Sequence, residues 1–273
     1  MSRIHRPMSP TPICLITGAS SGIGAALARE FAGHGHTLVL TARREAELDR
    51  LADEIARTGT LRPNVIAADI ASSAGADALQ DVVAKRGLEV EILVNNAGFG
   101  LLGEAGELDL GHQLAIIDLN VRALTDLTLR FVDSITRRRG GILNVASIAG
   151  FLPGPGMAVY HASKAYAVSF SEALHGELGS KGVKVCALCP GPVPTPFLTR
   201  AGIPHDYFPR FLARSADRVA RAGYEGFMAG HRVVVPGTPN RVLTLLPRLL
   251  PRGLVTEAAA WRWRHSVNPH GQA

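Results

Sequence analysis

The chain has 273 residues, of which 47% are hydrophobic, and its formal net charge is +6. This apolar content is enough to bury a core, so it excludes a globally disordered chain. The positive charge would suit nucleic acid or anionic lipid, but the basic residues are dispersed and are not interleaved with aromatic residues, so we predict no nucleic-acid partner. The ten histidines lack the spacing of metal ligands, and we predict no metal site.

The first twelve residues (MSRIHRPMSPTP) contain three prolines and no apolar core, which favours a flexible leader over a signal peptide. Residues 13–236 show no internal break in composition, so we assign them to one domain. Residues 237–273 form a C-terminal extension of different character.

Six short apolar runs are the predicted strands, at residues 13–18, 36–42, 64–70, 90–98, 140–147 and 183–191. Segments with helical spacing alternate with them, at residues 23–35, 45–58, 75–87, 108–137 and 157–179. Near-continuous apolar strands that alternate with helices indicate a parallel sheet with both faces covered. The predicted fold class is therefore α/β, a doubly wound parallel sheet that binds ligands beyond the carboxyl ends of its strands.

Three cysteines, Cys14, Cys186 and Cys189, do not suggest a disulfide framework. The last two have C-x-x-C spacing, but they lie in an apolar run, which favours buried thiols over a redox or metal pair. Free buried thiols fit a reducing, cytoplasmic compartment. The arginines at 137–139 end a helical pattern, and we interpret them as a solvated helix end.

The first strand runs directly into TGASSGIG, residues 17–24, which places glycines at Gly18, Gly22 and Gly24. Glycine permits a sharp turn and a close approach to a ligand, and the free amides at a helix start attract a pyrophosphate. A tight turn without a ligand is the alternative. The strand before the motif and the helix after it favour the functional interpretation.

The end of the second strand carries Ala42, Arg43 and Arg44, where an acidic residue would bind an unphosphorylated ribose. An arginine pair can hold a phosphate and stack on adenine, with help from Ser20 or Ser21 of the glycine loop. A solvated helix start is the alternative, but cations there oppose the helix dipole. We therefore predict a preference for NADP(H), with NAD(H) as the second choice.

Two further strand ends fit the same cofactor. Asp69 ends the third predicted strand and can accept a hydrogen bond from the adenine amino group. NNAG, residues 95–98, ends the fourth strand, where asparagine amides can tie adjacent strand ends together and Gly98 leaves space for the cofactor. Each signal is weak alone, and NNAG could be a plain turn, so the prediction depends on their order along the chain.

Tyr160 and Lys164 lie four residues apart in PGMAVYHASK, so both side chains project from one face of the predicted helix. A nearby ammonium lowers the pKa of a tyrosine from its usual value of about 10. Tyr160 would then serve as a general acid or base near neutral pH. Ser147, at the end of the fifth predicted strand, can hold a substrate oxygen against it.

These motifs resemble those of the classical short-chain dehydrogenase/reductase (SDR) family. TGASSGIG, NNAG, DLNV, the strand-end serine, YHASK and PGPVPT occur in the family's order within residues 13–196. The resemblance implies one Rossmann-type catalytic domain, a homodimer or homotetramer, and hydride transfer between a nicotinamide cofactor and a carbonyl or alcohol carbon. An NADPH-binding redox sensor with little turnover is the alternative, which an intact catalytic set disfavours.

The resemblance also implies roles for individual residues. Its catalytic set falls on Asn120, Ser147, Tyr160 and Lys164, in which Asn120 holds a water that links the lysine to solvent. Tyr160 would exchange a proton with the substrate oxygen, Ser147 would orient that oxygen, and Lys164 would anchor the nicotinamide ribose. The expected cofactor contacts are Gly18, Ser20, Ser21, Gly22, Ile23, Gly24, Arg43, Arg44, Asp69, Ile70, Asn96, Ala97, Gly98, Tyr160, Lys164, Pro190, Gly191, Val193 and Thr195.

The substrate is expected to contact residues 99–104, residues 148–157 and the segment after Thr195. No cationic clamp for a carboxylate is evident in the sequence, which favours a small hydrophobic ketone, aldehyde or alcohol. The candidate pocket residues, any of which could instead be core, are Phe99, Leu101, Leu102, Phe151, Leu152, Phe197, Leu198 and Phe208.

The C-terminal extension mixes leucines, arginines and two tryptophans, and Pro247 and Pro251 interrupt it. We expect it to cap the substrate pocket or to contact another subunit. Weak association with a membrane surface is the alternative. Its apolar runs are too short and too rich in arginine to cross a bilayer.

Overall fold

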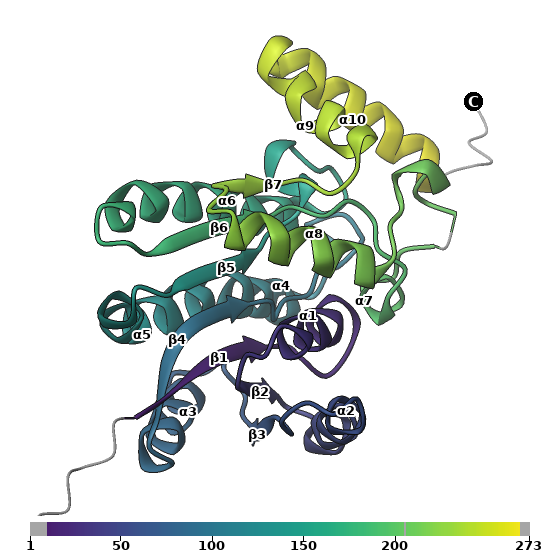
Figure 1. The fold of residues 1–273 in the computed structure, drawn as a ribbon. Coiled ribbons are helices and arrows are strands. Elements are labelled where there is room, and N and C mark those ends of the chain that lie inside the picture. The colour runs from purple at the N-terminus through teal and green to yellow at the C-terminus, as the bar shows by residue number, and fades with distance from the viewer. Residues whose placement is uncertain (1–9, 205, 268–273) are drawn as a thin grey trace, which may run out of the picture.

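The computed structural model describes residues 10–204 and 206–267, so the predicted leader up to residue 9 lies outside the described part. Within these residues the strands are β1 (Thr11–Thr17), β2 (Leu38–Ala42), β3 (Asn64–Ala67), β4 (Leu88–Asn95), β5 (Gly141–Val145), β6 (Lys184–Leu188) and β7 (Val233–Val234). They pair in parallel in the order β3-β2-β1-β4-β5-β6-β7 (Figure 1). The doubly wound parallel sheet predicted from the sequence is confirmed.

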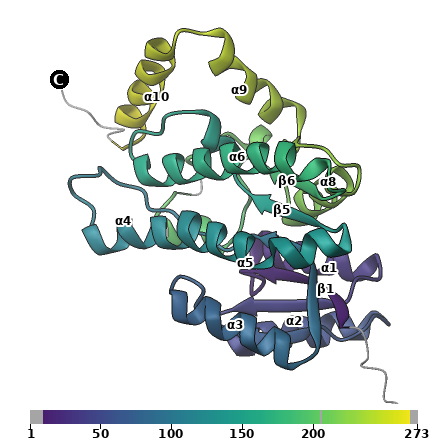
Figure 2. The ribbon, with the colours of Figure 1, turned by 90° about the vertical axis from the view of Figure 1, so that its left-hand side faces the viewer.

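The helices are α1 (Gly22–Gly33), α2 (Glu45–Arg57), α3 (Ser73–Lys85), α4 (Leu110–Ile117), α5 (Leu124–Arg138), α6 (Ala158–Gly179), α7 (Pro196–Arg200), α8 (Ala216–Met228), α9 (Thr238–Leu249) and α10 (Arg252–Val267). One face of the sheet packs against α1, α2 and α8, and the other packs against α3, α5 and α6 (Figures 1 and 2). In β1, Cys14 and Ile16 pack on the face that α1, α2 and α8 cover, whereas Ile13 and Leu15 pack on the face that α3, α5 and α6 cover. This alternation explains the near-continuous apolar sequence of the strand.

Three predicted boundaries are corrected by the structure. Strand β1 begins at Thr11, so the last two residues of the predicted leader belong to the sheet. The long helix expected over 108–137 is divided into α4 and α5 by a π-helical turn at Asp118–Ala123. The short strand β7 adds a seventh strand to the six expected. A π turn widens the helix by one residue, and its position coincides with a buried polar residue that is described below.

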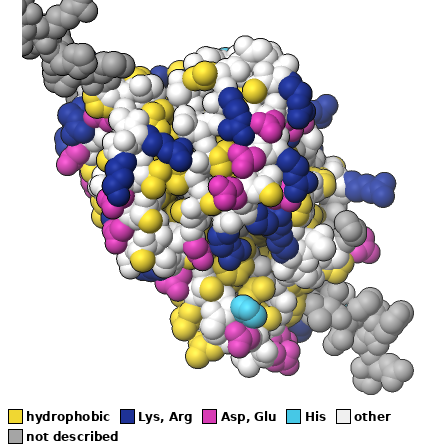
Figure 3. Space-filling model, turned by 90° about the horizontal axis from the view of Figure 1, so that it is seen from below, with side chains coloured by type: hydrophobic (Ala, Val, Ile, Leu, Met, Phe, Trp, Pro, Cys, Tyr) yellow, Lys and Arg dark blue, Asp and Glu magenta, His cyan; other side chains and the backbone are white. Residues whose placement is uncertain are grey.

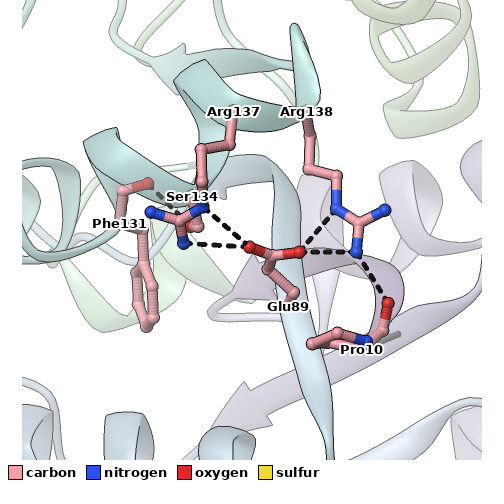
Figure 4. A network of polar contacts seen from close by, with 6 residues as sticks. All are labelled: Pro10, Glu89, Phe131, Ser134, Arg137 and Arg138. Atoms are coloured by element: carbon pink, nitrogen blue, oxygen red, sulfur yellow. Dashed lines mark hydrogen bonds and ion pairs between the residues drawn. The ribbon is translucent and has the colours of Figure 1, made fainter. Parts of the chain in front are cut away.

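The arginines at the end of α5 bind an acidic residue rather than only facing solvent (Figure 4). Glu89 of β4 accepts hydrogen bonds from Arg137 at 2.9 Å and from Arg138 at 2.5 Å. Arg138 also donates to the carbonyl of Pro10 at 2.7 Å. Burial by itself would raise the pKa of Glu89, but the two arginines outweigh it and hold that pKa below its ordinary value. The end of α5 is thereby fastened to the start of β1.

Charges of both signs alternate on the surface that carries α2 and α3. Figure 3 views the molecule from below the orientation of Figure 1, and on that face basic and acidic side chains lie next to one another with only scattered apolar groups between them. Arg62, in the loop after α2, binds two acidic residues of that helix, Asp49 at 2.8 Å and Asp53 at 2.7 Å. This face therefore lacks a continuous basic field of the kind that binds nucleic acid.

The C-terminal extension folds into two helices, α9 and α10, beside the β7 edge of the sheet (Figure 1). Trp263 of α10 is buried, and its ring lies where a Cβ on Gly156 would be only 2.2 Å away. This tight contact fixes α10 against the loop that precedes α6. Among residues 10–204 and 206–267, no helix combines the length and the apolar character needed to cross a bilayer.

Candidate active site

A cavity of about 770 Å³ lies at the carboxyl ends of the strands. Nearly all the site residues predicted from the sequence line it, although they come from segments far apart in the chain. Those lining it are Gly18, Ser20, Ser21, Gly22, Ile23, Arg43, Arg44, Asp69, Ile70, Asn96, Ala97, Gly98, Ser147, Tyr160, Lys164, Pro190, Gly191, Val193 and Thr195. Gly24 and Asn120 do not line it.

The glycine loop at one end of the cavity has the geometry of an anion site. Gly18 and Gly22 have φ angles of +63° and +59°, a region that other residues rarely adopt. Helix α1 starts here, and its N-cap residue, Ser21, makes no side-chain hydrogen bond to the first amides of the helix. Amides that the protein itself leaves without a cap are suited to a phosphate. The loop therefore fits the pyrophosphate of a dinucleotide.

Gly24 lies in a tightly packed position behind the cavity wall. A Cβ at this position would lie 2.4 Å from Asn96 Nδ2 and 2.4 Å from the carbonyl oxygen of Gly18. Asn96 Nδ2 itself donates to the carbonyls of Thr17 and Gly18, at 2.9 and 3.1 Å. The predicted tie between neighbouring strand ends is thus confirmed, and it requires a glycine beside it.

The adenosine end of the cavity carries the two arginines after β2. Arg44 is the N-cap residue of α2, and its Nη2 donates to Ser20 Oγ of the glycine loop at 3.0 Å. Arg43 is exposed beside it. Asp69, after β3, accepts a hydrogen bond from the Ala71 amide at 3.2 Å, so part of its role is to shape its own turn.

The catalytic end brings Tyr160 and Ser147 together. Tyr160 lies in the first turn of α6, and Ser147 follows β5. Burial raises the pKa of Tyr160 to about 12, and a hydrogen bond with Ser147 opposes that rise. The sequence predicted a lowered tyrosine pKa, so this expectation is wrong for the protein alone. Removal from water disfavours the phenolate more strongly than the neighbouring groups favour it.

Lys164 lies in the same cavity but is almost entirely buried. Its Nζ donates to the carbonyl of Val145 at 2.8 Å and lies 5.8 Å from the centre of the Tyr160 ring. Burial lowers the pKa of Lys164 to about 8. The lysine is therefore an ammonium that releases its proton more readily than an exposed one, which suits a group that exchanges protons.

Asn120 positions the loop after β4 from within the π turn between α4 and α5. Its Oδ1 accepts from the Phe99 amide at 3.1 Å, and its Nδ2 donates to the Phe99 carbonyl at 2.9 Å and to Ser163 Oγ at 3.0 Å. A Cβ on Gly98 would lie 2.9 Å from Asn120 Oδ1. The side chain thus holds Gly98 and Phe99 at the cavity wall without lining the cavity itself.

The substrate side of the cavity only partly follows the sequence prediction. Phe99, Leu152, Phe197, Leu198 and Phe208 line it, whereas Leu101, Leu102 and Phe151 do not. Leu102 and Phe151 instead pack in hydrophobic clusters beside it. Ile203, Tyr207 and Leu212 also line it, and they belong to the segment after Thr195 in which the sequence predicted substrate contacts. Leu243, Ala259, Arg262 and Trp263 line it from the C-terminal extension, which the sequence predicted to be a cap or a subunit contact without singling out these residues.

A model of the short chain dehydrogenase family matches residues 12–203. The chain belongs to this family. A curated relative, sulfoacetaldehyde reductase 2 of Chromohalobacter salexigens, is 37% identical over 194 residues, which are 70% of this chain and 76% of the relative. The resemblance stated from the motifs is thereby confirmed.

Solved structures of short-chain dehydrogenases share the whole architecture. One from Sphingobium yanoikuyae, in complex with NADPH, has a TM-score of 0.78 and 30% identity and covers 96% of each chain. One from Burkholderia phymatum, in complex with NAD, has a TM-score of 0.77 and 26% identity and covers 88% of this chain and 94% of its own. This SDR protein is therefore an oxidoreductase with a nicotinamide cofactor, and its similarity extends to relatives with either form of that cofactor.

The buried lysine gives this SDR a testable pH signature. The pKa of Lys164 is about 8 in the folded protein, against an ordinary value of 10.5. Between these two pH values the lysine is therefore protonated in the unfolded chain but largely unprotonated in the folded protein. Burial of the charged lysine therefore lowers the free energy of unfolding by its full amount below pH 8. This loss of stability becomes smaller as the pH rises toward 10.5. We expect Lys164→Met to gain stability relative to the parent below pH 8, and this gain to shrink by on the order of 2 kcal/mol across that window.

Urea unfolding of the two proteins at several pH values measures this difference, and other titrating groups cancel in it. A stability difference that stays constant with pH would show that Lys164 titrates like an exposed lysine.

Proposed function

We propose that this protein transfers a hydride between NADP(H) and the carbonyl or alcohol carbon of a hydrophobic substrate, with Tyr160 as general acid and base. The observation that carries the proposal is that one cavity holds the glycine loop at one end and Ser147, Tyr160 and Lys164 at the other. A redox sensor with little turnover is the weaker alternative, because it would need no proton donor beside the nicotinamide position.

The cofactor supplies or accepts the hydride when it is bound, and the protein's own residues manage the proton. Tyr160, with its pKa raised to about 12, is protonated at neutral pH and can donate to a carbonyl oxygen as it is reduced. Ser147 orients that oxygen. Lys164 would hold the nicotinamide ribose of a bound cofactor. Its charge lies next to the tyrosine ring, and its lowered pKa allows it to pass a proton on.

The substrate end of the cavity supports a hydrophobic carbonyl or alcohol. Its wall is formed mainly by aromatic and aliphatic side chains, including Phe197, Phe208 and Trp263, and Arg200 and Arg262 also line it. Phe197 lies 5.5 Å from the Tyr160 ring, centre to centre, so an apolar substrate would be held directly against the proton donor.

We also propose that the protein is a homodimer or homotetramer in the cytoplasm. Exposed apolar side chains on α4 and α5, namely Leu110, Leu114, Ile117 and Leu129, support a homodimer or homotetramer. The three cysteines are free and buried, which supports a reducing, cytoplasmic location.

The proposal is tested first by NADPH oxidation over a panel of hydrophobic ketones and aldehydes, with NADH in parallel. We expect a 10- to 100-fold preference for NADPH, because one hydrogen bond to a charged group contributes roughly 1.5–3 kcal/mol. Ala42→Asp combined with Arg43→Ile should move the ratio of the two kcat/KM values toward NADH. The change adds a ribose acceptor and removes a phosphate donor.

Arg57→Ile is the matched control, because it removes an exposed arginine from the other end of α2. The prediction is contradicted if the parent prefers NADH, or if the double substitution leaves the ratio of the two kcat/KM values unchanged. Either result would show that Ala42 and Arg43 do not determine binding of the cofactor's ribose phosphate. Absence of turnover with any carbonyl, despite tight NADPH binding, would favour the sensor.

A further inference from the structure

The two C-terminal helices present apolar side chains on both of their faces. On the inner face, Val255 and Trp263 are buried, and Leu243 and Ala259 line the cavity. Packing against the protein accounts for this face. A helix that is apolar on its remaining face as well needs a second apolar environment.

The outer face exposes large apolar side chains at helical spacing. In α9, Val242, Leu245 and Leu249 recur at intervals of three and four residues, and Leu249 is 80% exposed. We call Leu249, Leu250 and Leu254 the apolar tip, because they surround the turn between the helices. Leu250 and Leu254 are 48% and 60% exposed. A scattered exposed leucine is normal on a protein surface, but a cluster at one turn marks a contact site.

The same segment is strongly basic. Residues 238–267 contain five arginines and a single acidic residue, Glu257. Arg241, Arg252 and Arg264 are exposed, and Arg252 is the first residue of α10, next to the apolar tip. Elsewhere on the surface, as on the face in Figure 3, acidic side chains lie among the cations. Here leucines and a tryptophan, Trp261, are accompanied almost only by arginine.

We propose that the apolar tip docks on an anionic lipid bilayer, with its leucines in the interfacial region and the surrounding arginines against lipid phosphates. This combination of shallow apolar insertion and cationic flanks is what binds interfacial helices to membranes. A second copy of the chain fits less well, because a twofold contact sets a patch against itself and would bring Arg252 toward its own counterpart. The bilayer supplies the negative charge that the patch lacks.

This docking is peripheral and reversible. The apolar tip inserts from a turn, and within the described residues no helix is suited to span the membrane. Figures 1 and 2 show α9 and α10 as a projection beyond the β7 edge of the sheet, so the tip can meet a flat surface without the sheet in the way. The proposal does not depend on the catalytic assignment, because it requires only the folded chain.

The test is co-sedimentation of the full chain with phosphatidylcholine vesicles, with and without phosphatidylserine. We expect binding to the anionic vesicles that weakens with added salt and is released by a carbonate wash. Leu249→Glu with Leu254→Glu should reduce the partition coefficient about tenfold or more, since each removes an apolar insertion and adds a repelled charge. Arg252→Glu should also weaken binding, and its effect should shrink at high salt.

Leu61→Glu is the matched control, because Leu61 is 68% exposed in the loop between α2 and β3 and lies outside the C-terminal helices. Circular dichroism verifies that each variant is folded. Equal binding of the tip variant and this control, or binding that ignores phosphatidylserine, would overturn the proposal. A parent that forms dimers which the tip variant loses, with no vesicle binding, would assign the tip to a second copy instead.

Discussion

Tyr160→Phe is expected to lower kcat for carbonyl reduction by about 10²- to 10⁴-fold, the range that one general acid contributes. The substitution removes the phenolic hydroxyl, which carries the transferable proton and bonds Ser147, and leaves the aromatic ring in place. The ring keeps its contacts with Phe197 and His161, at 5.5 and 6.1 Å between ring centres. The Kd for NADPH should therefore stay close to that of the parent. Single-turnover NADPH oxidation, together with a fluorescence titration of NADPH, separates the two effects.

The parent enzyme should also show the raised pKa of Tyr160 in its pH dependence. Because this pKa is about 12, the phenol stays protonated through neutral pH, and the reduction step should not lose its proton donor there. Oxidation of an alcohol needs the deprotonated form, so its rate should rise with pH.

Tyr166→Phe is the control for the same chemical change on the same helix. Tyr166 is exposed, bonds Thr125 Oγ1 at 2.7 Å and stacks on Phe170, away from the cavity. It should retain parental turnover. Near-parental turnover of Tyr160→Phe would contradict the assigned mechanism.

Lys164→Arg is expected to reduce kcat by about 100-fold although it conserves the charge, because small displacements in an active site have effects of this size. Lys164 Nζ is enclosed: it donates to the Val145 carbonyl at 2.8 Å, and a Cβ on Gly98 would lie 3.4 Å from it. A guanidinium is larger and planar, and it keeps its proton, so it can neither fit this space nor take part in proton exchange. Steady-state kinetics with saturating NADPH measures the loss.

Lys184→Arg is the matched control. Lys184 also donates to a backbone carbonyl, that of Met228 at 2.8 Å, but it does so at the surface, where a guanidinium has room. Its activity should be unchanged. If Lys164→Arg were as active as this control, charge alone would account for the role of Lys164.

Motifs that act through the backbone of a few consecutive residues were predictable from the sequence. The glycine loop is one, because Gly18 and Gly22 adopt positive φ angles, which glycine accommodates at a tight turn whatever surrounds it. The division of the helix around Asn120 was not predictable. The π turn coincides with hydrogen bonds from Asn120 to Phe99 and Ser163, which lie 21 and 43 residues away.

The protonation behaviour of the catalytic pair likewise needed the structure. The spacing of Tyr160 and Lys164 indicates that the two side chains share a helix face, and it led to an expected fall in the tyrosine pKa. In the folded protein both groups are removed from water, which raises the pKa of Tyr160 and lowers that of Lys164. Desolvation depends on everything packed around a group, so spacing alone gave the wrong sign for the tyrosine.

The sequence by itself therefore determined the family, the parallel sheet and the residues at its carboxyl edge, because alternating strands and helices bring successive strand ends to one edge of the sheet. The tertiary structure alone decided which side chains of the C-terminal extension close the cavity. The sequence predicted the extension to be a cap or a subunit contact, but no local pattern marks Trp263 and Leu243, in the helices that follow the last strand, as lining residues. Their position depends on packing between segments about a hundred residues apart, as when Trp263 meets Gly156, and such long-range contacts are fixed only when the chain is folded.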